Sequence, residues 1–132
     1  MAEKGTWGSP GSSTIAIALT PAPFKVRSEQ KRGVFVILVE GELDMNTAPQ
    51  LERQLEAPLA APGSNLLIDL SRCEFIDSTG IALIVRTWQT LDRRFSICGI
   101  GDQVKRVLDV TGLESTIPTH PSRDDALAQL QG

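Results

Sequence analysis

The strongest hydrophobic signal in the chain is an unbroken run of β-branched, aromatic and leucine residues at positions 34–39. A run without polar alternation is typical of a strand that is buried on both faces. Residues 24–29 precede it across a polar link at 30–33, so we expect the two segments to pair as a hairpin. Further short strands are expected at 65–70, 95–98 and 116–117, with a loop at 71–74 before the chain returns to the core at 75–76.

Other segments repeat apolar residues at the spacing of a helix with one buried face. In the first helix these positions are Ala48, Leu51, Leu55 and Leu59, and in the second they are Ile81, Ile84, Val85, Trp88 and Leu91. We expect Asp44 or Asn46 to cap the first helix. Its end is predicted at Pro58, Pro62 and Gly63.

Two more helices follow toward the C-terminus. We expect Asp102 to cap the third helix and Gly112 to end it, while Ser122 caps the fourth. The element order is therefore β-β-α-β-α-β-α-β-α, in which alternation after the hairpin implies parallel strands joined by helical crossovers. The sequence predicts an α/β fold with a single domain, a mixed β-sheet with about four helices packed against it.

The N-terminal stretch has a different composition from the rest. Residues 1–13 are rich in Gly, Ser and Pro and contain too little apolar area to offset the entropy of ordering them. Residues 14–19 would form an edge strand or continue this segment. We therefore expect a flexible tail over residues 1–20 and the folded domain over residues 21–132.

Composition excludes several classes of function. The 132 residues carry 13 Lys and Arg against 16 Asp and Glu, a net charge of −3, which gives no basic face for nucleic acid. No apolar run approaches the roughly 18 residues of a membrane helix, and no secretory signal is visible, so we expect a cytoplasmic protein without a membrane partner. Cys73, Cys98 and His120 are too few and too scattered for a structural zinc site, and no cofactor is expected.

Motifs of common enzymes are missing. The chain has no G-x-S-x-G, G-x-x-x-x-G-K-[ST] or H-E-x-x-H pattern. Residues 99–102 begin like a dinucleotide fingerprint but lack its third glycine, which favours a plain turn between strand and helix. We interpret His120 as a surface residue and both cysteines as small core residues. The sequence therefore indicates a protein that is not an enzyme.

The segment Asp77-Ser78-Thr79-Gly80 has two interpretations that the residues alone leave open. The first is a helix cap, because Asp, Ser and Thr side chains accept hydrogen bonds from the free N–H groups of a first turn. The second is a site for an anion or a phosphorylated serine at the positive end of the helix. Gly80 costs up to about 1 kcal/mol against alanine in a first turn, so it suggests a close approach to the backbone.

One face of the same helix is suited to docking. Ser78, Ala82, Arg86 and Gln89 align along it, and Leu83 lies nearby without being needed by the buried stripe. The alternative is an ordinary solvated face.

Four motifs in order resemble the STAS domain of bacterial anti-sigma-factor antagonists. They are EGELD at 40–44, LLIDL at 66–70, FIDSTGI at 75–81 and VKRVLDVTGL at 104–113. The resemblance implies a mixed sheet with helices on one side. It also implies a partner, an anti-sigma factor that is a serine kinase, whose capture frees a sigma factor.

The resemblance assigns roles to individual residues. The phosphoacceptor is the serine after the motif's Asp, here Ser78, with Thr79 as the weaker candidate, and a metal-dependent Ser/Thr phosphatase reverses the modification. Asp44, Met45 and Asn46 are expected to join Asp77, Ser78, Thr79, Gly80, Ala82, Leu83 and Arg86 in the docking surface. Two alternatives remain: a module that binds a nucleotide or small anion, and a scaffold subunit of a bacterial stress-signalling complex.

Overall fold

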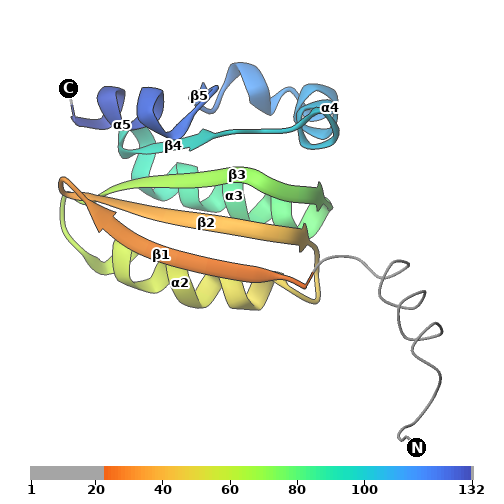
Figure 1. Ribbon diagram of the computed structural model, residues 1–132, viewed down its shortest axis with the longest axis horizontal. Coiled ribbons are helices and arrows are strands. Elements are labelled where there is room, and N and C mark those ends of the chain that lie inside the picture. Colours follow the sequence, from red (N-terminus) through yellow and green to blue (C-terminus); the bar gives the residue numbers. More distant parts are fainter. Residues whose placement is uncertain (1–22, 132) are drawn as a thin grey trace, which may run out of the picture.

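Five strands form one mixed sheet in the computed structural model, which describes residues 23–131 (Figure 1). The predicted tail at 1–20 and the alternative strand at 14–19 lie outside the described residues. In sheet order the strands are β1 (Lys25–Lys31), β2 (Val34–Leu43), β3 (Asn65–Ile76), β4 (Phe95–Cys98) and β5 (Thr119–His120). The first pair is antiparallel and each later pair is parallel, as the alternation of strands and helices predicts.

The β1–β2 hairpin closes through a two-residue turn. Lys31 pairs with Val34, and the residues between them, Arg32 and Gly33, have φ values of 52° and 81°. Two positive φ values in succession are the requirement of a type I′ turn, whose twist matches that of the flanking strands. This confirms the hairpin expected from the polar link.

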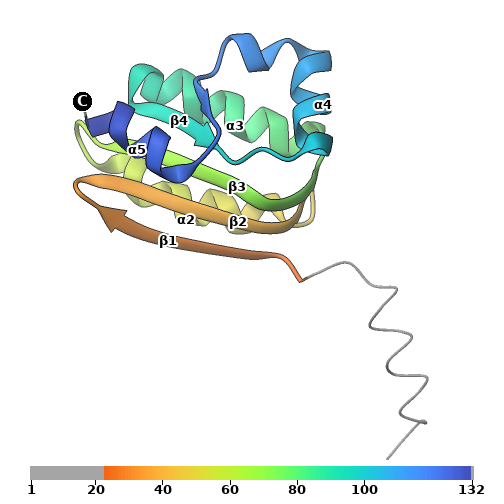
Figure 2. The ribbon, with the colours of Figure 1, turned by 45° about the horizontal axis from the view of Figure 1, so that its top comes forward.

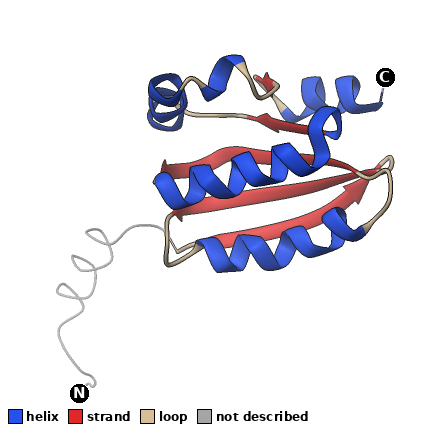
Figure 3. Ribbon diagram, turned by 180° about the vertical axis from the view of Figure 1, so that it is seen from behind, coloured by secondary structure: helices blue, strands red, loops and turns tan. Residues whose placement is uncertain are grey.

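Two helices cover one face of the sheet. Figure 3 shows α2 (Ala48–Ala60) and α3 (Ser78–Leu91) side by side in front of the strands. Their apolar residues join one core with the side chains that point to this face from the strands. The fully buried members of this core include Ile37, Leu43, Leu51, Leu55, Leu66, Ile68 and Ile84.

The expectation that all helices lie on one side was wrong. α5 (Arg123–Gln131) packs on the opposite face, where Ala126 and Leu127 cover Val36 and Leu67 (Figure 2). The reason is the alternation along the buried strands, which sends apolar side chains to both faces. α4 (Asp102–Thr111) buries Val104 and Leu108 against the first core.

Several predicted boundaries need correction. Residues 71–74 are part of β3 and not a loop, and β2 follows them through two register shifts. The last strand is Thr119–His120 and not 116–117. Pro58 is buried inside α2, and the helix ends only at Ala60.

Two of the predicted helix starts differ in their capping. Asp102 is the first residue of α4, where the preceding Gly101 is the N-cap and no side chain caps the helix. Ser122 does cap α5, because its Oγ accepts the Asp125 N–H at 3.2 Å. Gly112 ends α4 in the left-handed conformation, as predicted.

Candidate functional site

Asp77 connects the start of α3 to the loop that follows β2. Its Oδ1 accepts the N–H of Gly80 at 3.0 Å, which makes Asp77 the N-cap of α3, in agreement with the first of the two interpretations of this segment. Its Oδ2 accepts the N–H of Met45 at 3.2 Å. The Asp77 N–H itself donates to the Leu43 carbonyl at 3.1 Å. One residue therefore fixes two segments that the sequence places far apart.

Asp44 organises the loop between β2 and α2. Its Oδ1 accepts the N–H groups of Asn46 and Thr47, at 2.9 and 3.1 Å. The Thr47 hydroxyl donates to the Glu42 carbonyl at 2.8 Å and accepts the Asp44 N–H at 2.9 Å. Thr47 is the N-cap by position, without a side-chain bond into the helix. Asp44 thus shapes the turn before α2, while Asn46 makes no side-chain cap.

Gly80 is explained by packing inside the protein. A Cβ at this position would lie 2.8 Å from Ile76 Cγ1 and 2.8 Å from Leu43 Cγ. Contacts this short do not occur between real side chains, so only glycine lets α3 start so close to β2 and β3. The close approach suggested by the sequence is therefore made by the core itself.

Ser78 and Thr79 project from this rigid turn. Both residues are exposed, and neither hydroxyl makes a hydrogen bond within the described part of the chain. Met45 lies in the neighbouring loop, where its N–H is bonded to Asp77 and 68% of its surface is exposed. The structure brings Asp44, Met45, Asn46 and the 77–80 turn together, as the sequence expected.

A groove between α2 and α3 lies further along α3 and is lined from that helix by Leu83, Arg86, Thr87 and Thr90. Leu55 and Leu83 form its floor, and Leu59, which is 39% exposed, stands at its side. Arg86 of α3 and Glu52 of α2 pair across it at 3.8 Å. Ala82 is exposed on the same face of α3.

The expectation that Leu83 lies outside the buried stripe of α3 was wrong. Only 5% of its surface is exposed, so it belongs to the core and reaches the outside only as part of the groove floor. The contributions of Glu52 and Glu56 from α2 were missed, because acidic residues on a helix are typical of a solvated face. Leu59 was expected in the buried stripe of this helix, but it is 39% exposed at the groove. Only the parallel packing of α2 against α3 turns that face into one wall of a groove.

The remaining chemical candidates have structural roles. Burial is the main cause that raises the pKa of Cys73 to about 11 and that of Cys98 to about 12, so both thiols stay protonated at neutral pH. Residues 99–101 form the turn from β4 to α4, and Gly99, with φ of +71°, lies against Ser71. Within residues 23–131 no group of three acidic, His or Cys side chains is arranged to hold a metal. None of the helices in that range is long and apolar enough to cross a membrane.

Comparison with known proteins identifies the family. Residues 25–126 match the STAS domain, and the chain belongs to this family. A solved anti-sigma factor antagonist from Mycobacterium paratuberculosis is 36% identical, with a TM-score of 0.77, over 86% of this chain and 100% of that one.

Two curated relatives carry related names. The anti-sigma-F factor antagonist RsfB of Mycobacterium tuberculosis is 29% identical over 85% of this chain and 93% of its own length. The anti-sigma-B factor antagonist of Listeria monocytogenes is 36% identical over 61% of this chain and 74% of its own length. The fold predicted from the motifs is therefore confirmed, and the relatives named here are antagonists of anti-sigma factors.

Proposed function

We propose that this protein is an anti-sigma-factor antagonist. It binds an anti-sigma factor with serine kinase activity in the cytoplasm and thereby frees the sigma factor. Phosphorylation of Ser78 then dissociates the complex with the anti-sigma factor. The observation that carries the proposal is the Ser78 hydroxyl, which is exposed and has no hydrogen bond within residues 23–131, on a turn that Asp77 fixes to the core. The names of the relatives support the choice of partner.

The geometry of the turn suits a phosphoacceptor. A kinase must place the hydroxyl in line with a phosphate, which favours an oxygen that is accessible and held on a rigid backbone. The bonds from Asp77 and the packing of Gly80 against Leu43 supply that rigidity. The N-terminal N–H groups of α3 favour negative charge, so a phosphate at Ser78 does not need to unfold the helix.

The same phosphate would weaken the complex. It adds about −1.5 to −2 charges beside the carboxylates of Asp77 and Asp44. In an interface around Met45 and Ser78 this charge would have to lose its water, and no ion pair within residues 23–131 brings a Lys or Arg to Ser78. An unpaired charge buried at an interface costs several kcal/mol, which is equivalent to a hundredfold or more in affinity. A metal-dependent Ser/Thr phosphatase then restores binding.

The groove between α2 and α3 would extend the docking surface along α3. Its floor is apolar and its α2 wall carries Glu52 and Glu56, so a partner helix with an apolar side chain flanked by Lys or Arg would fit. On α3, Ala82 lies between Ser78 and this groove, and Arg86 lines the groove itself. The contact would thus run from the 44–46 loop across the turn and along α3.

Phosphate transfer tests the proposal. The purified cognate anti-sigma factor and ATP are incubated with the full chain, and the modified residue is identified by peptide mass spectrometry. We expect one phosphate, on Ser78, with none on the Ser78→Ala variant and normal transfer to Thr79→Ala. If the phosphate were found on Thr79 alone, the phosphoacceptor would be Thr79 and not Ser78. No transfer and no complex with any kinase-type anti-sigma factor of the source cell would refute the proposed function.

A further inference from the structure

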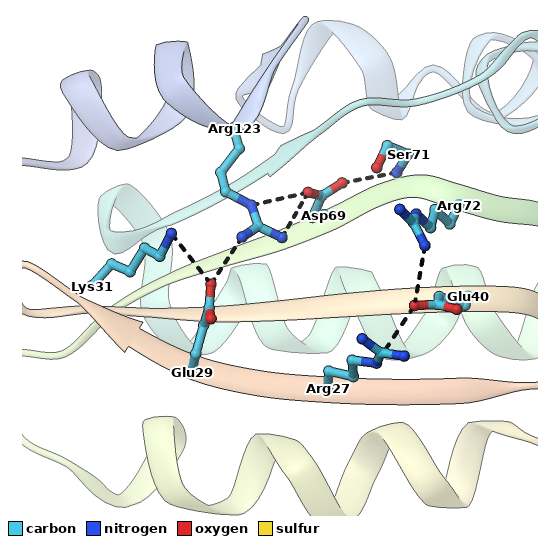
Figure 4. Close-up of polar contacts among 8 residues, drawn as sticks. All are labelled: Arg27, Glu29, Lys31, Glu40, Asp69, Ser71, Arg72 and Arg123. Atoms are coloured by element: carbon cyan, nitrogen blue, oxygen red, sulfur yellow. Dashed lines mark hydrogen bonds and ion pairs between the residues drawn. The ribbon is translucent and has the colours of Figure 1, made fainter.

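The face of the sheet opposite α2 and α3 is only partly covered. α5 lies over the first half of β2, where Val34 and Val36 are each 1% exposed. Beyond it, Leu38 and Glu40 remain partly exposed, and β1 lies beside them at the edge of the sheet. Figure 4 shows that charged side chains from β1, β2 and β3 gather on this open part.

One group of these charged side chains forms ion pairs with one another, around Arg123. Its guanidinium contacts the buried Asp69 at 3.1 Å and Glu29 at 2.9 Å (Figure 4). Asp69 also accepts the Ser71 N–H at 2.9 Å. Donors and acceptors meet at hydrogen-bond distance here, so this cluster fastens the start of α5 to the sheet and offers little to a ligand.

A second cluster consists of Arg27, Glu40 and Arg72. Its charged groups do not meet at hydrogen-bond distance. Both arginines approach the same oxygen of Glu40, Arg27 at 3.7 Å and Arg72 at 3.9 Å, which is beyond hydrogen-bond distance. That oxygen is buried and has no hydrogen-bond partner in the described part of the chain. The arginine side chains are 65% and 68% exposed, whereas the Glu40 side chain is 16% exposed.

The outer surface of this cluster is therefore cationic. Two guanidinium groups face the solvent with N–H donors that have no partner among the described residues, and the one carboxylate between them is recessed. Lys25 and Glu74 line the adjacent hollow with opposite charges that offset each other. We call Arg27, Glu40 and Arg72 the arginine clamp. It stands out because the whole chain has a net charge of −3.

We propose that the arginine clamp binds an extended acidic segment of a partner protein, on the face of the sheet opposite the Ser78 site. The spacing supports this occupant. The two guanidinium groups come from the strands on either side of β2 and approach the same Glu40 oxygen, so two carboxylates on alternate residues of an extended segment, about 7 Å apart, can each face one of them. Each carboxylate meets a planar fork of N–H donors, the geometry that arginine favours for such pairs.

This second surface leaves the Ser78 face unoccupied. The clamp is built from β1, β2 and β3, whereas the 44–47 loop, α2 and α3 form the other face (Figures 1 and 3). The chain would then hold an acidic segment and an anti-sigma factor at the same time. The proposal does not depend on the identity of the Ser78 partner.

The test is a binding titration at low salt with a fluorescent peptide in which Glu and Thr alternate. We expect saturable binding to the full chain that weakens about tenfold or more in the double variant Arg27→Gln/Arg72→Gln. The variant Arg93→Gln/Arg106→Gln removes the same charge from exposed positions elsewhere and should leave affinity unchanged. Glu40→Gln removes the recessed negative charge and should tighten binding.

Other outcomes would overturn the proposal. Equal loss of affinity in both double variants would show unspecific attraction. If an RNA oligonucleotide bound more tightly than the peptide and depended on the same arginines, the occupant would be a nucleic acid. If sedimentation showed self-association that Arg27→Gln/Arg72→Gln abolished, the occupant would be a second copy of the chain. Circular dichroism of each variant checks that loss of binding is not loss of fold.

Discussion

The Met45 N–H donates to Oδ2 of Asp77 at 3.2 Å, and this bond ties the loop after β2 to the first turn of α3. The other oxygen of Asp77 is occupied by the Gly80 N–H. The exposed Met45 side chain and the exposed Ser78 hydroxyl therefore stand on one rigid unit. A partner that contacts both would recognise a preformed surface, which lowers the entropic cost of binding.

Replacing Asp77 by alanine removes both of these acceptors. We expect Asp77→Ala to lower the free energy of unfolding by about 1–2 kcal/mol, because the cap of α3 and the bond to the loop are lost together. Urea denaturation measures the change. Asp102→Ala is the matched control, since Asp102 begins α4 without a side-chain cap and should cost about 0.5 kcal/mol through the helix dipole alone. Equal losses would contradict the role given to Asp77.

Gly80 and Gly101 form a second matched pair. Gly80→Ala forces a Cβ to within 2.8 Å of Leu43 and Ile76, so we expect a loss of about 1–3 kcal/mol in unfolding free energy. Nothing lies within 4 Å of the position that a Cβ would take at Gly101, where φ is −82°. Gly101→Ala should stay within about 0.5 kcal/mol of the unchanged chain. A harmless Gly80→Ala would show that α3 has room to move away from β2.

The buried thiols predict how stability depends on alkaline pH. The pKa of Cys73 is raised to about 11 and that of Cys98 to about 12, so the folded protein binds these protons more tightly than the unfolded chain. Their contribution is complete below the ordinary thiol pKa near 9 and is lost as pH rises through 11 and 12. We expect unfolding free energy to fall above pH 9. The double variant Cys73→Ala/Cys98→Ala should show a shallower fall, and an unchanged slope would speak against this origin.

The ion pair between Arg123 and Asp69 should stabilise the docking of α5. Arg123→Met leaves the Asp69 carboxylate buried without its cation, which costs about 3 kcal/mol in comparable cases. The double variant Arg123→Met/Asp69→Asn should recover part of this loss, because no charge remains unpaired. Thermal unfolding measures both variants. Arg72→Met is the control, since the Arg72 side chain is 68% exposed and lies 3.9 Å from Glu40, which also keeps Arg27 nearby, so this contact should be worth less than about 1 kcal/mol.

The sequence predicted most of the architecture because each buried element carries a strong local pattern. The run at 34–39, the helical stripes and the turn glycines are all readable without tertiary contacts. The wrong predictions concern segments whose secondary structure depends on tertiary packing. Residues 71–74 look polar enough for a loop, yet they continue β3 because their exposed side chains face solvent while Cys73 points inward.

In the candidate site, too, local features could be predicted from the sequence and tertiary contacts could not. The capping role of Asp77 is a local property and was one of the two interpretations of its segment, whereas its bond to Met45 joins residues 32 positions apart and needs the fold. Leu83 was wrongly expected outside the buried stripe, because the spacing of apolar residues was interpreted for a helix that is covered on one face only. α3 packs against both the sheet and α2, so its buried arc is wider and includes Leu83 and Thr87.

The central claim is that one phosphate on Ser78 separates this protein from its anti-sigma factor. Isothermal titration calorimetry with the purified cognate anti-sigma factor compares the unmodified chain with the chain phosphorylated on Ser78. We predict that phosphorylation weakens binding about a hundredfold or more, that Ser78→Ala binds like the unmodified chain, and that Ser78→Glu lies between. Equal affinity of the phosphorylated and unmodified chains would contradict the switch.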